Sequence, residues 1–234
     1  MPGPRRFYRA VEVAARDGGF AVLLDGKPAR TPAQGPFLSP TRGLADAIAA
    51  EWDVQEKTIE PLTMPLWVLV SSALYDVVQA RERVVENVAG FARTDLLCYR
   101  ATHPTDLIVL QRERWQPHLD WAAREFEAPL KVMDGVIFED QPEPALAALR
   151  KVVAAQDDHR LAAMSHAARA LGSLILALAL VRGRISGEEA VALSFLDELY
   201  QIAKWGDDPE AHARRAEIHA EVLAAERFMA LVTP

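Results

Sequence analysis

The chain has 234 residues, of which half are hydrophobic and a quarter are charged, so it can bury a large core in one or two domains. Its net charge of −7, without any run of basic residues, argues against binding to nucleic acid or to an anionic membrane. The lone cysteine, Cys98, has apolar neighbours and is interpreted as a buried thiol in a reducing compartment. No apolar segment follows Arg5 and Arg6, so we expect no signal peptide and a cytoplasmic location.

The first sixty residues predict a small β-rich domain with one helix. Strand-forming residues dominate 7–13 and 20–24, and Asp25-Gly26 between 20–24 and 27–31 is typical of a two-residue hairpin turn with positive φ angles. The returning strand, 27–31, contains Pro28 and is therefore expected at a sheet edge. Such a unit is too small to be stable alone, so it must pack on the rest of the chain.

One helix is expected to complete this domain, with Ser39 as its N-cap and Pro40 in its first turn. Its buried face would be lined by residues that recur at helical spacing: Leu44, Ile48 and Trp52. The proline-rich segment 58–65 follows as a linker, which places a domain boundary near residue 60. The expected fold class is thus α+β, with a β-rich domain over 1–60 and a larger, mostly α-helical domain over 61–234.

The larger domain is predicted to be a series of helices with little extended structure. The helical segments cover 66–79, 81–94, 104–126, 142–155 and 159–182. Residues 95–100 fit either a short extended piece or a helix end, and 130–138 indicates a strand interrupted at Asp134-Gly135.

The last third of the chain pairs a wholly apolar helix with a charged one. Residues 171–181 have almost no polar atom but are far fewer than the roughly 20 that span a bilayer, so we expect a buried helix and no membrane insertion. A second helix would follow Ser186-Gly187 and end at Trp205-Gly206. Its apolar face, expected to pack on the first helix, consists of Val191, Phe195, Leu199 and Ile202. Asp208-Pro209 would open the final helix.

Catalytic and metal-binding signatures are absent from the sequence. There is no Gly-x-Gly pair, no phosphate-binding loop and no Gly-x-Ser-x-Gly, and no Asp or Glu has a His three residues later. Apolar flanks would raise rather than lower the pKa of Cys98, which argues against a nucleophile. We therefore expect no cofactor, no metal and no catalytic residue.

A group of acidic residues near two tryptophans is harder to explain by packing alone. The strip Asp197, Glu198, Asp207, Asp208 and Glu210 is either a solvated helix face or a partner-binding surface, and Trp205 beside it is either a core residue or an anchor. Glu51 and Trp52 form a second such pair, although Trp52 shares the stripe of Leu44 and Ile48 and is better explained by packing.

Five sequence blocks occur in a particular order along the chain: DGKPARTP at 25–32, AAEWDVQ at 49–55, TDLLCYR at 94–100, GSLILALAL at 172–180 and LDELYQIAKWGDDPEA at 196–211. Together they resemble the ATP synthase assembly chaperones that bind the unassembled alpha subunit of the catalytic head. The resemblance extends from about residue 7 to 231. It implies a monomeric, cofactor-free chaperone that shields the beta-facing interface of alpha until beta arrives, and no enzyme activity.

The resemblance also implies roles for individual residues. Glu198 matches an acidic motif of the family and is the first candidate for partner contact, and Trp205, Gly206 and Asp207 match a second block. Asp197, Asp208 and Glu51 complete the expected contact set, whereas Trp52 and Gly206 are expected to be structural. Eukaryotic members act in mitochondria. This chain shows no leader and is rich in Ala and Arg, so a bacterial member is expected.

Two other functions remain open from the sequence. The first is a small-molecule enzyme with a site at the domain junction, built from Glu51, Asp53, Glu198 and Asp207. It would require an apolar pocket that holds two of these acids with strongly shifted pKa values. The second is a general adaptor for other clients. For a chaperone, we expect Glu198 to be exposed, so that Glu198→Lys weakens capture of alpha and leaves folding nearly intact.

Overall fold

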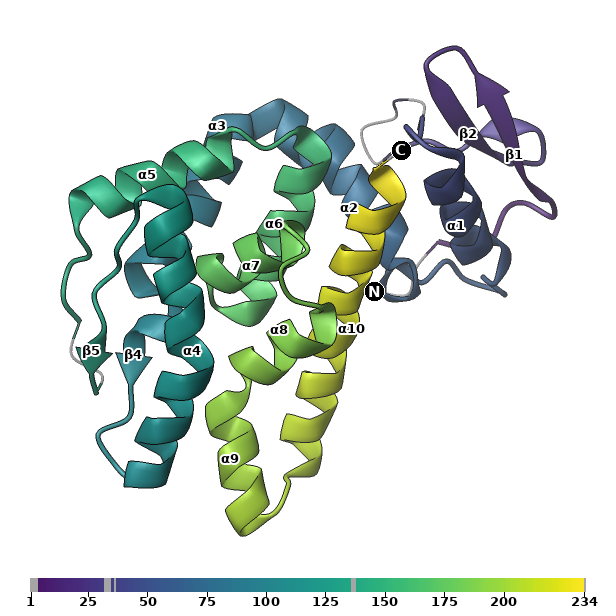
Figure 1. Cartoon of the computed structure of the whole chain (residues 1–234). Helices are drawn as coiled ribbons and strands as arrows, with labels where there is room; N and C mark the ends of the chain where they lie inside the picture. The colour runs from purple at the N-terminus through teal and green to yellow at the C-terminus, as the bar shows by residue number, and fades with distance from the viewer. Residues whose placement is uncertain (1–3, 32–34, 36, 136–137, 234) are drawn as a thin grey trace.

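The computed structural model describes residues 4–31, 35, 37–135 and 138–233. It has a small antiparallel sheet built from the start of the chain, joined to a much larger helical body (Figure 1). The predicted α+β class, with a β-rich N-terminal part followed by mostly helical structure, is confirmed. The C-terminal end of the last helix returns to the N-terminal sheet and the helix beside it (Figure 1).

The N-terminal sheet has the order β1-β2-β3, and its strands are Val11–Arg16, Gly19–Leu24 and Lys27–Pro28. The hairpin turn is confirmed, because Asp25 and Gly26 have φ angles of 49° and 76°. The first strand begins four residues later than predicted. Backbone N–H groups of Arg9 and Ala10 donate to the Asp25 carboxylate rather than to a neighbouring strand. The third strand is reduced to two residues, although the N–H of Ala29 still donates to the carbonyl oxygen of Val22 in β2 at 2.8 Å.

Helix α1 (Arg42–Asp53) begins two residues later than predicted. Ser39 is not its cap, because the Ser39 backbone pairs with Phe20 of β2. Thr41 is the cap instead, and its hydroxyl oxygen accepts from the N–H of Leu44 at 3.2 Å. The predicted buried face is correct: Leu44, Ile48 and Trp52 are all buried against the sheet unit.

The helical body begins with α2 and α3, which follow one another as a continuous but bent helical segment. They are joined by a π-helical segment, Ser72–Val77, and α3 has a kink at Ala80. Short extended pieces β4 and β5 pair in parallel, so the predicted strand at 130–138 is reduced to two residues; its positions 136 and 137 lie outside the described residues. The helices from α2 to α6 are Pro65–Ser71, Val78–Gly90, Thr105–Phe126, Glu143–Ala154 and Asp158–Leu171, and the strands β4 and β5 are Tyr99–Arg100 and Met133–Asp134.

Two predicted long helices are each divided in the structure. Gly172, with φ of 63°, separates α6 from α7 (Leu174–Val181), and Phe195 separates α8 (Gly187–Ser194) from α9 (Leu196–Trp205). Because α8 and α9 change direction, the predicted apolar face does not stay against α7, and Leu199 is 43% exposed. The final helix is α10 (Pro209–Val232), which opens at Asp208-Pro209 as expected, with Asp208 as its N-cap.

Two apolar clusters hold the fold together. One surrounds α7, whose residues from Leu174 to Leu180 are all buried, and lies within the helical body. The other joins β2, α1 and α2 to Ala224 and Phe228 of α10, so it contains residues from both sides of position 60. Within the described residues, no helix is both long and apolar enough to cross a membrane.

Candidate partner-binding surface

The α9–α10 hairpin forms an end of the helical body that points away from the N-terminal sheet (Figure 1). Leu196 is the one buried residue of α9, whose remaining side chains are partly or fully exposed. Gly206 ends α9 with a φ of 88°, a conformation that suits glycine, and the chain then turns into α10. This hairpin carries most of the residues that the sequence singled out.

Arg215 of α10 is the centre of the acidic group. Its two terminal nitrogens donate separately to the carboxylates of Glu198 and Asp207, and its side chain is only 11% exposed. The hydrogen bond from Arg215 holds the pKa of Asp207 below its ordinary value, and His212, 3.0 Å from the same carboxylate, acts in the same direction. The side chains of Glu198 and Asp207 remain about one-third exposed.

The pairing with Arg215 corrects the expected behaviour of Glu198. The sequence suggested a free surface acid, whereas the Glu198 carboxylate is one of two that neutralise a largely buried guanidinium. Glu198→Lys would place a lysine beside Arg215, so we expect it to lower the free energy of unfolding by about 1 kcal/mol rather than leave it nearly unchanged. A neutral variant is therefore needed beside it in any binding test.

Two other acids of the strip are tied to the fold. Asp197 accepts a 2.7 Å hydrogen bond from the side-chain amide of buried Gln111, which joins α9 to α4. Asp208 accepts from the N–H of Ala211 at 2.9 Å and caps α10. Both carboxylates thus have structural partners within the chain, and neither needs an external one.

Trp205 is not a core residue, because 76% of its surface is exposed at the end of α9. Leu199, less than two turns earlier, is 43% exposed. Nearby, Lys204 pairs with Asp106 at 2.9 Å and lies over the ring of Tyr200. The hairpin thus presents an aromatic and an aliphatic side chain beside acids that are held by one arginine.

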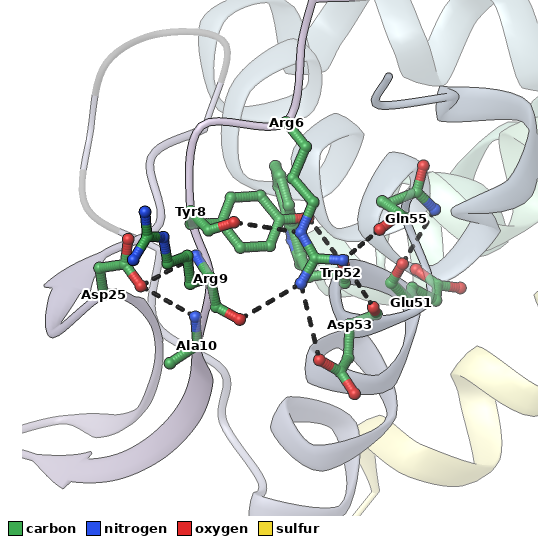
Figure 2. A network of polar contacts seen from close by, with 9 residues as sticks. All are labelled: Arg6, Tyr8, Arg9, Ala10, Asp25, Glu51, Trp52, Asp53 and Gln55. Carbon is green, nitrogen blue, oxygen red and sulfur yellow. Dashed lines mark hydrogen bonds and ion pairs between the residues drawn. The ribbon is translucent and has the colours of Figure 1, made fainter. Parts of the chain in front are cut away.

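Glu51 and Trp52 lie elsewhere, where α1 meets the start of α2 (Figure 2). Both oxygens of Glu51 accept backbone N–H groups, from Leu66 and Trp67, at 2.8 Å. Burial raises the pKa of Glu51, and the two hydrogen bonds partly oppose that rise. The indole of Trp52 is 6% exposed and packs edge-on against Tyr8 and Trp67. Glu51 therefore holds the N-terminus of α2, a role that sequence reasoning did not foresee.

Arg6 completes this junction, and it was missed because a pair of arginines near a chain end does not reveal which distant residues it contacts. Its guanidinium lies over the ring of Tyr8 and donates to the backbone carbonyl oxygens of Tyr8 and Asp53, each at 3.1 Å (Figure 2). The hydroxyl of Tyr8 donates to the carbonyl oxygen of Trp52 at 2.7 Å. The N-terminal segment is thereby attached to the end of α1.

Asp95 was also missed, although it lies in one of the blocks that carry the resemblance. It is completely buried and accepts from the hydroxyl of Ser173 at 2.8 Å and the N–H of Ile175 at 3.0 Å. Burial raises its pKa to about 6, against these hydrogen bonds. Its position at the start of α7 resembles that of Glu51 at the start of α2.

The four carboxylates of the enzyme alternative are not gathered in one pocket. Glu198 and Asp207 share Arg215, whereas Glu51 binds backbone groups of α2 and Asp53 lies 3.9 Å from Arg6. Two surface cavities, one between α3 and α5 and one beside α10, are lined by none of these four acids. Among the described residues, no three His, Cys, Asp or Glu side chains are grouped so that they could hold a metal.

Comparison with known proteins assigns the fold to a class of chaperones. A model of the family described as ATP12 chaperone protein matches residues 5–123. A mitochondrial Atp12 protein of Schizosaccharomyces pombe is 26% identical over 225 residues, which cover 91% of this chain and 77% of that protein. The chain belongs to the ATP12 chaperone family.

Solved structures agree with this assignment over nearly the whole chain. The crystal structure of Atp12 from Paracoccus denitrificans is 42% identical, with a TM-score of 0.90 and 98% of each chain covered. A putative chaperone from Agrobacterium tumefaciens is 40% identical, with a TM-score of 0.89 over 98% of this chain and 87% of that one. The chaperone class and the α+β architecture inferred from the sequence are thus both confirmed.

Proposed function

We propose that this protein binds the unassembled alpha subunit of ATP synthase and shields its beta-facing interface until the beta subunit replaces it. The observation that carries the proposal is the exposed Trp205, which stands beside the Glu198–Arg215–Asp207 group on a projecting hairpin of an ATP12-family chaperone. A subunit interface that is still uncovered is apolar and prone to aggregate, so its chaperone must cover apolar surface and later release it.

The chemistry of the hairpin suits reversible binding of this kind. An aromatic side chain supplies buried apolar area with little loss of conformational freedom, and surrounding charges select the partner and speed its approach. Arg215 neutralises one of the two carboxylate charges, so the group keeps one net negative charge. If Glu198 turns to a partner protein, Arg215 remains paired with Asp207 and is not left as an unpaired buried cation. We propose that the protein acts as a monomer without a cofactor in the bacterial cytoplasm, and that it is not an enzyme.

Co-expression with isolated alpha or isolated beta subunit tests the proposal. Capture of alpha but not beta is expected, and Trp205→Ser and Glu198→Lys should each lower the yield of the complex by about tenfold or more. Glu198→Gln, which removes the charge without creating a second cation, separates loss of contact from loss of fold. Glu12→Lys is the matched control, because Glu12 is an exposed acid on β1 that undergoes the same charge reversal.

Three results would count against this function or this surface. Capture of neither subunit would contradict the function itself. Equal capture of alpha, beta and unrelated unfolded proteins would favour a general adaptor. Normal capture of alpha by Trp205→Ser and by both Glu198 variants would leave the function intact and remove the hairpin from the contact surface.

A further inference from the structure

An apolar groove lies beside α10 on the side away from α9, and no residue of the acidic strip lines it. We call it the α10 groove. Its volume is about 480 Å³, and it is bounded by the segment before α2 and α2 itself on one side and by α6 and α10 on the other. The lining residues used below are Leu62, Val68, Leu69, Ala220, Ala224 and Glu217.

The mouth of the groove carries an aliphatic side chain that is almost fully exposed. Leu62 is 98% exposed, in a short helical turn, Pro61–Thr63, that leads into α2. Single exposed leucines are common on protein surfaces, but this one adjoins a concave wall formed by Val68, Leu69 and Ala224. A concave apolar wall with an apolar residue at its rim is typical of a binding groove.

The charges around the groove indicate what kind of side chain would fit. Glu221 is already occupied, because it accepts from Arg169 and lies 3.3 Å from His166. Partial burial acts to raise the pKa of Glu221, but His166 and Arg169 outweigh it, so the pKa is lowered and the carboxylate stays ionised. Glu217 is exposed and forms no ion pair with any residue that the structure describes. One free carboxylate beside an apolar wall favours an apolar side chain that has a lysine or arginine as its neighbour.

A row of glutamates leads along α10 from the turn of the hairpin to the groove, on the face of the helix opposite Arg215. Glu210, Glu217 and Glu221 are spaced seven and four residues apart, so they lie on one face of the helix. The seven residues from Glu210 to Glu217 correspond to a rise of about 10 Å. A partner that contacts Glu210 at the turn of the hairpin can therefore reach the groove with a short segment of chain.

We propose that the α10 groove is a second docking site for the unassembled alpha subunit. In this arrangement an apolar side chain of alpha enters between Leu62 and Ala220, and an adjacent basic side chain pairs with Glu217. The inference rests on the proposed function, because the same client would occupy both the hairpin surface and the groove. Two separated contacts would let the chaperone hold a large surface by weak, individually reversible interactions.

The test uses the full chain with p-benzoylphenylalanine in place of Leu62, co-expressed with alpha subunit and irradiated. A cross-link to an alpha peptide that contains Lys or Arg is expected. In capture experiments, Leu62→Asp and Glu217→Lys should each lower the yield of the alpha complex by about tenfold. Val78→Asp is the matched control, since Val78 is 59% exposed and does not line the groove.

Failure of the groove as a docking site and failure of alpha binding itself, on which the groove proposal rests, would give different results. If Leu62→Asp and Glu217→Lys capture alpha as well as the unsubstituted chain does, the groove is not a docking site and the proposed function stands. A cross-link to a second copy of this chain, or no cross-link while alpha is captured, also excludes the groove as a site for alpha. If the unsubstituted chain captures no alpha, both proposals are overturned.

Discussion

The junction of α1 with α2 and the tip of the α9–α10 hairpin use the same residue types for different ends. Each places a glutamate near a tryptophan, Glu51 with Trp52 and Glu198 with Trp205. At the junction the carboxylate binds two backbone N–H groups and the indole is 6% exposed. At the tip the carboxylate binds a guanidinium and the indole is 76% exposed. Acid beside aromatic is therefore not by itself a mark of a recognition surface.

Helical spacing distinguishes the two pairs. Trp52 continues the buried stripe of Leu44 and Ile48, so the fold of α1 places it inside. Trp205 ends a helix of which only Leu196 is buried, and nothing in the described chain covers it. What an acid can do then follows from its partner. Backbone donors fix Glu51 in the fold, whereas Glu198 shares Arg215 with Asp207 and keeps about one-third of its side chain exposed to another protein.

The same substitution at the two tryptophans should give the largest contrast. Trp52→Arg removes a buried aromatic and places a cation among Tyr8 and Trp67, so we expect a loss of more than about 3 kcal/mol in the free energy of unfolding. Trp205→Arg should change it by less than about 0.5 kcal/mol. Urea denaturation of both variants measures the two values. Equal losses would show that the two tryptophans do not differ in burial as described.

The free energy of unfolding should also depend on pH through Asp95, a third carboxylate and one that is completely buried. Its pKa is about 6 in the folded chain, against 3.8 for an ordinary aspartate, so the folded state binds the proton more tightly. The stabilisation is complete below about pH 4 and is lost as pH rises through 6, a change of about 3 kcal/mol at most. Asp95→Asn removes this dependence.

Urea denaturation at several pH values between about 4 and 7 tests this directly. The difference in unfolding free energy between the parent chain and Asp95→Asn should shrink, or reverse sign, as pH rises across this window. Asp207, whose pKa is lowered by Arg215, works in the opposite direction and loses its contribution as pH falls. A difference between parent and Asp95→Asn that stays constant with pH would contradict the prediction.

The smallest expected effect concerns the cap of α2. Glu51→Gln keeps one acceptor oxygen but turns an N–H₂ group toward the backbone N–H of Leu66 or Trp67, so a loss of about 1 to 2 kcal/mol is expected. Asp53→Asn is the matched control, because Asp53 is exposed and its carboxylate lies as far as 3.9 Å from Arg6. Thermal unfolding of the two variants compares them, and a control as unstable as Glu51→Gln would indicate that capping is not the cause.

Local patterns predicted much of the fold because they reflect backbone requirements that do not depend on distant contacts. Asp25-Gly26 formed the expected turn, the stripe from Leu44 to Trp52 is buried, and Asp208 caps α10. The wholly apolar residues from Leu174 to Leu180 could only be an interior helix, and they are.

The missed features depend on contacts between segments far apart in the chain. The helix break at Gly172 is an exception with a local signal, because Gly172 ends α6 in the left-handed conformation and Ser173 caps α7; the break at Phe195 has no side-chain cap. Glu51 contacts residues about fifteen positions away, and Asp95 contacts residues about eighty positions away. At the candidate site, sequence matching identified Glu198 and Asp207, but it could not show that Arg215 lies between them.

The position of α10 bears on how this protein is made. Ala224 and Phe228 belong to the same apolar cluster as β2 and α1, and the hydroxyl of Thr41 donates to the carbonyl oxygen of Leu231. A ribosome delivers α1 and α2 long before α10, so the apolar surface of these two helices that α10 covers stays exposed until synthesis is nearly complete. Domains of most multidomain chains fold in order as they emerge. Here the N-terminal unit has to wait for the final helix, so this chaperone itself passes through a stage with exposed apolar surface.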